Sequence, residues 1–130
     1  MHHAKIFLST VLFTLFFIFS ASAQQKIQID SVSAYIGKTV KVCDKVAGTF
    51  VTKPVPLKAV SDKPITYLNL GADYPNSKLT IVIFQKDLIN FPITPSDHYK
   101  GMDVCVTGEV GTYRDKVQII AKRLQQIEVL

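Results

Sequence analysis

The chain has 130 residues, of which 19% are charged, and its formal net charge is +5 at pH 7. From this length we expect one domain with one modest core. The basic excess permits anionic partners without requiring them, because the charges are spread along the chain rather than clustered.

Residues 1–23 predict a secretory signal. Lys5 provides a basic start, residues 6–19 form a mostly apolar run, and Ala21-Ser22-Ala23 is an A-x-A cleavage site. The run is shorter than the roughly 20 residues of a membrane-spanning helix, which disfavours an uncleaved anchor. We expect a mature protein of residues 24–130 that is periplasmic or secreted and has no membrane span after signal cleavage. Without Lys5 it carries 14 basic and 10 acidic residues.

The first residues of this mature chain predict a short helical turn. Asp30 or Ser31 can cap its start, because their side chains accept hydrogen bonds from free backbone N–H groups. Gly37 can end it, because glycine readily adopts the left-handed conformation found after helices. We expect Tyr35-Ile36 to lie over one end of the strand assembly.

Three segments show the period of two that is typical of half-buried strands: Thr39–Val51, Ile65–Leu70 and Leu79–Gln85. In the first, the valines face one way and Cys43 faces the other, and Gly48 allows a bend. In the second, Tyr67 and Asn69 lie on the face opposite the two leucines. Lys53–Pro64 contains three prolines and three lysines, and therefore predicts a loop.

The remaining elements are a helical turn and a hairpin. Ser96 can cap one helical turn that runs through Tyr99. Residues 101–123 predict two strands joined by a two-residue turn at Arg114-Asp115, whose type stays open because it lacks glycine. Gly108 within the first of these strands predicts a bend or bulge. This hairpin places Thr112, Val110 and Gly108 opposite Val117, Ile119 and Ala121.

Five strands, with one short helical segment between the third and fourth, predict an all-β, five-stranded Greek-key barrel. Several short segments support this: Leu68-Asn69-Leu70-Gly71 with Tyr74-Pro75-Asn76, Tyr99-Lys100-Gly101 and Val106-Thr107-Gly108. In these, and over about residues 35–127, the chain resembles small single-domain exported bacterial OB-fold proteins related to anticodon-binding-type nucleic-acid OB-folds. Asp44 departs from the family pattern, which has glycine there. The resemblance implies one OB-fold domain over residues 24–130.

The OB-fold resemblance predicts where the two cysteines lie relative to each other. In an OB barrel the first and fourth strands are antiparallel neighbours, so Cys43 and Cys105 can face each other outside the barrel. An oxidising compartment would then favour a disulfide between them. The alternative is two separate thiols that stay reduced. A metal site is not expected, since the sequence has no CxxC and His98 is the only histidine after the signal. We expect no cofactor.

Catalytic motifs are not found in the sequence, so we expect a protein that is not an enzyme. The competing interpretation is a nuclease of the staphylococcal type, which is also built on an OB barrel. Such an enzyme needs clustered carboxylates for a metal and two arginines for the phosphate. The mature chain has only Arg114 and Arg123, and its carboxylates do not cluster in the expected strands.

Ligand binding is the function that the resemblance implies. OB-folds commonly bind oligonucleotides or oligosaccharides on the face of strands two and three, between two flanking loops. Rings can stack on bases while cations follow the phosphates, which favours single-stranded nucleic acid or a similar anionic oligomer. The alternatives are an envelope protein, peptide or glycan as ligand, or aromatic residues that only pack the barrel. The candidate binding residues are Tyr67, Asn69, Phe84, Tyr113, Arg114, Lys116, Lys53, Lys58 and Lys63.

Overall fold

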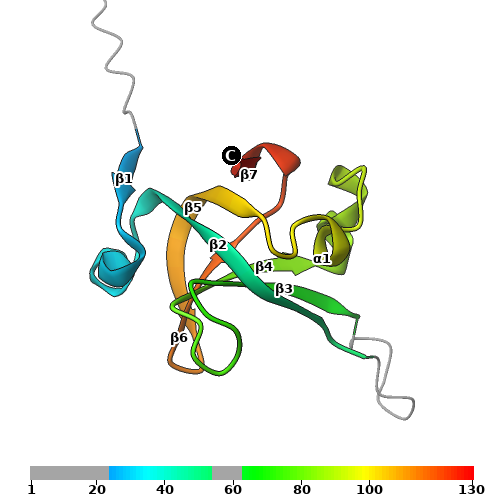
Figure 1. Cartoon of the computed structure of the whole chain (residues 1–130), viewed down its shortest axis with the longest axis horizontal. Helices are drawn as coiled ribbons and strands as arrows, with labels where there is room; N and C mark the ends of the chain where they lie inside the picture. The colour runs from blue at the N-terminus through cyan, green and yellow to red at the C-terminus, as the bar shows by residue number, and fades with distance from the viewer. Residues whose placement is uncertain (1–23, 54–62) are drawn as a thin grey trace, which may run out of the picture.

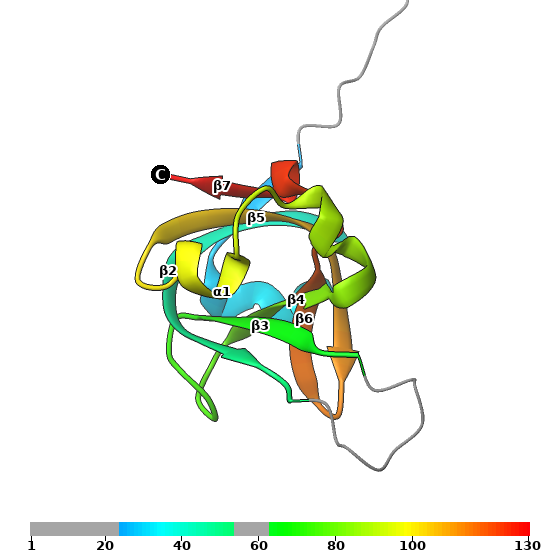
Figure 2. The same ribbon diagram turned by 90° about the vertical axis from the view of Figure 1, so that its right-hand side faces the viewer.

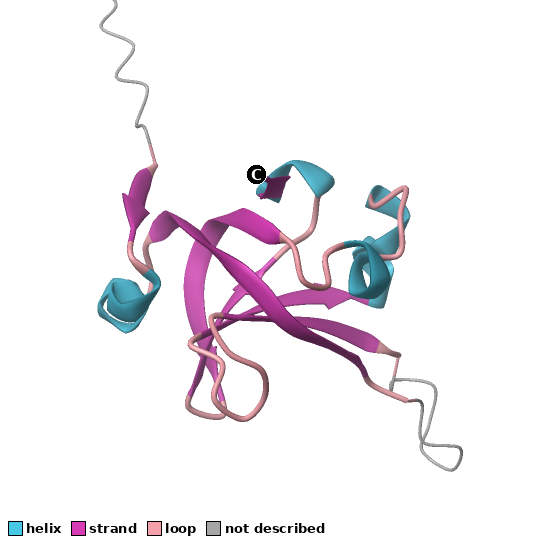
Figure 3. Cartoon of the chain, viewed as in Figure 1, coloured by secondary structure: helices cyan, strands magenta, loops and turns pink. Residues whose placement is uncertain are grey.

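The computed structural model describes residues 24–53 and 63–130, and strands dominate it (Figures 1 and 3). The predicted signal lies outside the described residues, as does most of the predicted proline-rich loop. The described part has seven strands: β1 (Gln25–Ile27), β2 (Thr39–Val51), β3 (Ile65–Leu70), β4 (Leu79–Phe84), β5 (Asp103–Tyr113), β6 (Lys116–Ile120) and β7 (Ile127–Val129). Its helical segments are short: η1 (Ile29–Tyr35), η2 (Gln85–Asn90), α1 (Pro95–His98) and η3 (Leu124–Gln126).

The strands follow the order β1-β2-β3-β4-β6-β5-β7, and β2 also pairs with β5. The strands β2, β3, β4, β6 and β5 therefore form a ring, which Figure 2 shows from one end. The ring is partly closed, because β4 and β6 pair in parallel through only three residues each. The expected count of five strands was wrong. The two extra strands, β1 and β7, are three-residue additions to β2 and β5, too short to show an alternating pattern.

The core fills the inside of the ring. The valines and leucines that the alternation predicted to face inward are buried, with exposed fractions of 0–1%: Val40, Val42, Val46, Leu68 and Leu70. The segment η1 lies at one end of the ring and α1 at the other (Figure 2). Tyr35 packs against the core at the η1 end as expected, whereas Ile36 is 52% exposed and does not.

Both helical starts differ from the predicted ones. The first helix begins at Ile29 after Gln28, and not at a cap formed by Asp30 or Ser31. The second begins at Pro95 after Thr94, so Ser96 lies inside the helix rather than before it. Proline fits this first position because the N–H that it lacks would have no partner within the helix.

A bulge in β2 changes which side chains face outward. Val46 pairs with Leu70, but Gly48 pairs with Asn69, so Ala47 is an extra residue on β2. The bend that was predicted at Gly48 is therefore confirmed. The strand also changes partner here. It pairs with β5 up to Lys45 and with β3 from Val46 onward.

The β5–β6 hairpin has the predicted register, with Val110 opposite Ile119. Arg114 and Asp115 form the turn and both have positive φ angles, 48° and 62°. Two such residues are the signature of a type I′ turn, whose twist matches that of the flanking strands. Immediately before the hairpin pairing begins, β5 passes close to β6 at Gly108, where a Cβ atom would overlap the Ile119 side chain.

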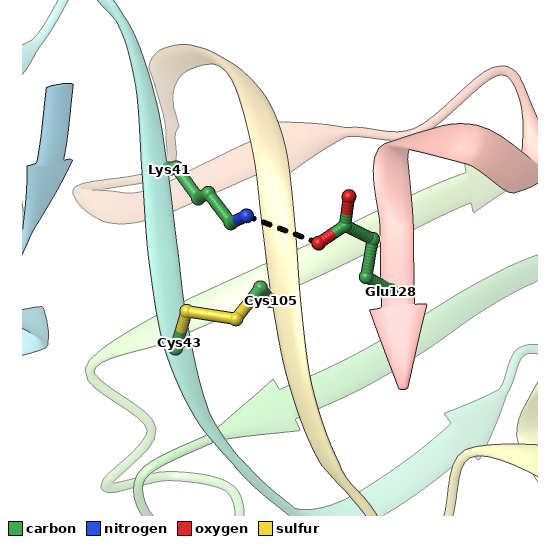
Figure 4. A network of polar contacts seen from close by, with 4 residues as sticks. All are labelled: Lys41, Cys43, Cys105 and Glu128. Carbon is green, nitrogen blue, oxygen red and sulfur yellow. Dashed lines mark hydrogen bonds and ion pairs between the residues drawn. A yellow bond between two sulfur atoms is a disulfide. The ribbon is translucent and has the colours of Figure 1, made fainter. Parts of the chain in front are cut away.

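The predicted disulfide is present. Cys43 and Cys105 are directly opposite each other in the β2–β5 pairing, and their sulfur atoms are bonded (Figure 4). The bond lies next to an ion pair between Lys41 of β2 and Glu128 of β7, whose charged atoms are 3.0 Å apart. The disulfide therefore joins β2 to β5 on the outer side of the ring. None of the helices in the described part is long and apolar enough to span a membrane.

Candidate ligand-binding groove

A groove of about 840 Å³ crosses the outer face of the ring, and we call it the aromatic groove. Strands β2, β3, β4 and β6 provide its floor, while the β3–β4 loop and the β5–β6 turn form its walls. This loop and the hairpin tip overlap in Figure 1 but stand apart in Figure 2. The face is continuous because β3, β4 and β6 are neighbours in the ring. It is the face on which the resemblance to OB-folds predicts a ligand site.

Four aromatic side chains line this groove. Phe50 and Tyr67 pair across β2 and β3, and their rings are stacked, with centroids 6.5 Å apart and an interplanar angle of 16°. Phe50 is 58% exposed, because the bulge turns it outward. Tyr74 on the loop and Tyr113 beside the turn are 76% and 56% exposed. Exposed rings at several walls of one groove are suited to stacking on flat ligand groups.

The floor is a hydrogen-bonded polar cluster. Asn69 is only 4% exposed, and its Nδ2 donates to Oδ1 of Asp73 at 3.1 Å. Its Oδ1 accepts a hydrogen bond from Oγ1 of Thr80 at 3.0 Å. The backbone N–H of Tyr74 also donates to Oδ1 of Asp73, at 2.8 Å. These bonds fix a carboxylate at the floor, where it can accept hydrogen bonds from ligand N–H or O–H groups.

Two cations stand at the hairpin tip. The Arg114 guanidinium lies 5.3 Å from the centroid of the Tyr113 ring, a distance at which a cation attracts a ring face. Nζ of Lys116 donates to the carbonyl oxygen of Pro75 at 3.0 Å, which connects the hairpin tip to the β3–β4 loop. Within residues 24–53 and 63–130 the ion pairs are Lys41–Glu128 and Lys78–Asp30. Arg114 and Lys116 therefore carry no neutralising carboxylate partner from the described residues.

The groove unites most of the candidate residues. Tyr67, Asn69, Tyr113, Arg114 and Lys116 all line it. The other candidates lie elsewhere: Phe84 pairs with Ile65 at the opposite end of the β3–β4 ladder, Lys53 and Lys63 flank the proline-rich segment, and Lys58 is outside the described residues.

Several lining residues were missed from the sequence. Phe50 and Tyr74 complete the aromatic set, and Asp73, Ser77 and Gln118 extend the polar floor. The glycine two residues before Phe50 was the available signal for an outward turn at that position. Tyr74 and Asp73 were treated only as turn residues, because the hairpin that faces them is distant in sequence.

The described residues contain no group of three or more His, Cys, Asp and Glu side chains that could hold a metal ion. The two arginines that a staphylococcal-type nuclease would need together line two different grooves. Arg114 lines the aromatic groove, and Arg123 lines a different one.

No protein-family model matches the chain, and no curated protein matches it. Among the solved structures, one superposes well enough to support the fold. A chain of the yeast Stn1 and Ten1 structure superposes with a TM-score of 0.55 and 14% sequence identity, covering 85% of this chain and 64% of the yeast chain. A Leishmania major Friedlin protein described as an aspartyl-tRNA synthetase gives 0.48 and 14%, covering 85% of this chain and 21% of that one. The partly closed ring is OB-fold-like. At this identity the likeness concerns the fold alone.

Proposed function

We propose that this protein is an exported, non-catalytic OB-fold module that binds single-stranded nucleic acid or a similar anionic oligomer in the aromatic groove. The observation that carries the proposal is the meeting of four aromatic side chains and two cations in one groove. The predicted signal and the disulfide both support export, since disulfides persist in oxidising compartments.

The groove suits a single strand better than a duplex. Rings such as Tyr67 and Tyr113 can stack only on bases that are exposed, which a duplex does not offer. Arg114 and Lys116 at the rim would bind the phosphates that flank the stacked bases. Asp73 would accept a hydrogen bond from a base N–H group, such as N3–H of thymine or uracil, so that the floor would bind bases while the rim binds phosphates.

Fluorescence polarisation with labelled dT12 and rU12 tests the proposal, using purified protein over 20–200 mM salt. Binding should weaken as salt rises, with a log–log slope of about −0.7 for each phosphate bound. Arg114→Ala should weaken binding and should also make the salt dependence shallower. Lys26→Ala, which removes a charge from β1 away from the groove, is the matched control and should change neither. Failure of both oligonucleotides to bind at 20 mM salt would refute the proposal.

A neutral glycan is the second candidate, and the Asp73–Asn69–Thr80 cluster favours it. Carboxylate and amide groups can bind sugar hydroxyls, while the stacked Phe50 and Tyr67 rings can support the apolar face of a sugar. Cellohexaose and chitohexaose, titrated by calorimetry, test this candidate. Binding of either sugar with little dependence on salt, together with failure of the oligonucleotides, would select the glycan.

A further inference from the structure

A second groove, of about 660 Å³, lies on the same outer face, and we call it the cationic groove. Gly111 of β5 and Ile120 of β6 form part of its floor, and Lys122 and Arg123 line it just after β6. Gln118 lines both this groove and the aromatic groove. In the strand pairing Gln118 lies between Thr80 of β4 and Gly111 of β5, so the two grooves adjoin at this side chain.

The backbone that carries the two cations is fixed by one side chain, that of Gln126. Its Oε1 accepts hydrogen bonds from the backbone N–H groups of Lys122 at 2.7 Å and Arg123 at 3.2 Å. Its Nε2 donates to the carbonyl oxygens of Thr107 at 3.1 Å and Ile120 at 3.3 Å. These four bonds hold the segment against β5 and β6, so the cations project from a fixed base.

A second side-chain amide holds the same segment, and it comes from an element that precedes this segment in the chain. Nδ2 of Asn90, in η2, donates to the carbonyl oxygen of Lys122 at 2.9 Å. Both polar atoms of the Lys122 backbone are therefore bonded to side chains. A rigid support of this kind lowers the ordering cost when a ligand binds.

The chemistry of the cationic groove differs from that of its neighbour. Its lining contains Lys122, Arg123 and one carboxylate, Glu109, and includes none of the four groove aromatics. Neither of the two ion pairs in the described residues involves these three side chains. A surface with two cations outside any ion pair, one carboxylate and no rings suits phosphate groups rather than bases, since phosphate contacts position a strand while rings stack on its bases.

We propose that the cationic groove is a second subsite that binds backbone phosphates of the same strand. The ligand would then be an oligomer long enough to run from the aromatic groove, past Gln118, to Lys122 and Arg123. This inference rests on the proposed function and adds a minimum ligand length to it. Glu109 sets one side of the path, because its carboxylate repels phosphate and directs the strand toward the cations.

A length series tests the inference on the purified protein. Labelled dT4, dT6, dT8, dT12 and dT16 cover the range of about 4–16 nucleotides that one OB-fold occupies. Affinity should rise in a step at the length that reaches the cationic groove, and then level off. The double variant Lys122→Ala/Arg123→Ala should remove this step and leave dT4 binding unchanged. The salt slope for dT16 should become shallower by about 0.7 for each phosphate that the variant no longer binds.

A matched charge control is the double variant Lys45→Ala/Lys100→Ala, which removes two exposed cations that line neither groove. It should keep the step. A second variant blocks the subsite without changing charge. A Cβ atom on Gly111 would meet no heavy atom within 4 Å, and the larger side chain of Gly111→Ile would extend from it over the groove floor. It should also remove the step, while its unfolding transition stays cooperative.

The outcomes separate the two proposals. If dT4 and dT16 bind equally well, or if the step survives in Lys122→Ala/Arg123→Ala, the second subsite is refuted and the aromatic groove still binds the strand. If the double variant weakens dT4 as much as dT16, the cations act through the general field of the protein, and the subsite is again refuted. If no oligonucleotide binds at low salt, both proposals fail.

Discussion

The carboxyl group of Asp73 lies against Gly48, so close that a Cβ atom at position 48 would overlap it. The strand β2 therefore leaves space for a side chain from the β3–β4 loop, and Asn69 and the Tyr74 backbone hold that side chain in place. The polar floor of the aromatic groove therefore requires glycine at position 48, because the methyl group of an alanine there would occupy the place of the Asp73 carboxyl group.

Gly48→Ala should lower the free energy of unfolding by about 1–3 kcal/mol, because the added methyl group forces Asp73 away from its hydrogen-bond donors. In an Asp73→Ala background the same change should be neutral or stabilising by up to about 1 kcal/mol, since alanine loses less backbone entropy than glycine in a strand. Urea denaturation of the wild type, the two single variants and the double variant measures the coupling energy between positions 48 and 73. Equal effects of Gly48→Ala in both backgrounds would contradict the close contact.

Tyr67→Ala should weaken oligonucleotide binding by about 1–3 kcal/mol, because one base then has no ring on which to stack. The fold should tolerate this change, because Tyr67 is only half-buried and packs on Phe50 at the surface. Tyr67→Phe keeps the ring and should keep most of the affinity.

Tyr99→Ala provides the opposite case. Tyr99 is 1% exposed, so its removal should cost about 3–5 kcal/mol of stability, as for other large buried aromatics. Polarisation and thermal melts on the same samples compare the two tyrosines. If Tyr67→Ala destabilised the protein as strongly as Tyr99→Ala, Tyr67 would be a packing residue and would not be the ring on which a base stacks.

Reduction of the disulfide should destabilise the protein by up to about 4 kcal/mol. The bond joins residues 62 positions apart, and this value follows from the chain entropy that such a crosslink removes from the unfolded state. Urea denaturation with and without dithiothreitol measures the loss. The Cys43→Ala/Cys105→Ala variant should not respond to dithiothreitol. Two free thiols in unreduced, denatured protein would contradict the pairing.

Burial raises the pKa of Tyr99 above its usual value. The folded protein therefore holds the neutral phenol while the unfolded chain ionises near pH 10. The contribution to stability is complete below about pH 10 and is lost as pH rises toward the folded pKa. Tyr99→Phe should flatten the fall in stability between pH 9 and pH 11. Lys78 affects both proteins alike, because hydrogen bonding to Asp30 raises its pKa in each. Parallel stability curves for the two proteins would refute this assignment.

The long strands could be predicted because each buries one face and exposes the other. Alternating valines in β2 and leucines in β3 assigned those faces correctly, and the hairpin register followed from the two-residue turn at Arg114-Asp115. The facing positions of Cys43 and Cys105 followed once β2 and β5 were taken as neighbours. The short edges β1 and β7 could not be predicted, because three residues contain too little pattern and their pairing depends on strands already formed.

The aromatic groove was predicted in part for a related reason. Tyr67 and Asn69 were found because they alternate with buried leucines in one strand. Phe50 was missed because continued alternation from Val46 points it inward, whereas the bulge at Ala47 turns it outward. Tyr74 lies in a loop, and only the fold brings it close to Tyr113 and Lys116. Contacts of this range leave no periodic signal in the sequence.

The bulge also determines how this strand must be compared with those of distant relatives. Residues before Ala47 and residues after it follow two different frames of alternation, with Val46 inward and Phe50 outward. A relative that lacks one residue in this strand keeps the same faces only if the missing residue corresponds to Ala47. An alignment gap placed beyond Phe50 instead, at Val51, would match Phe50 to an inward-facing position. For this strand, the position of a single gap decides whether an aromatic residue is interpreted as packing or as binding.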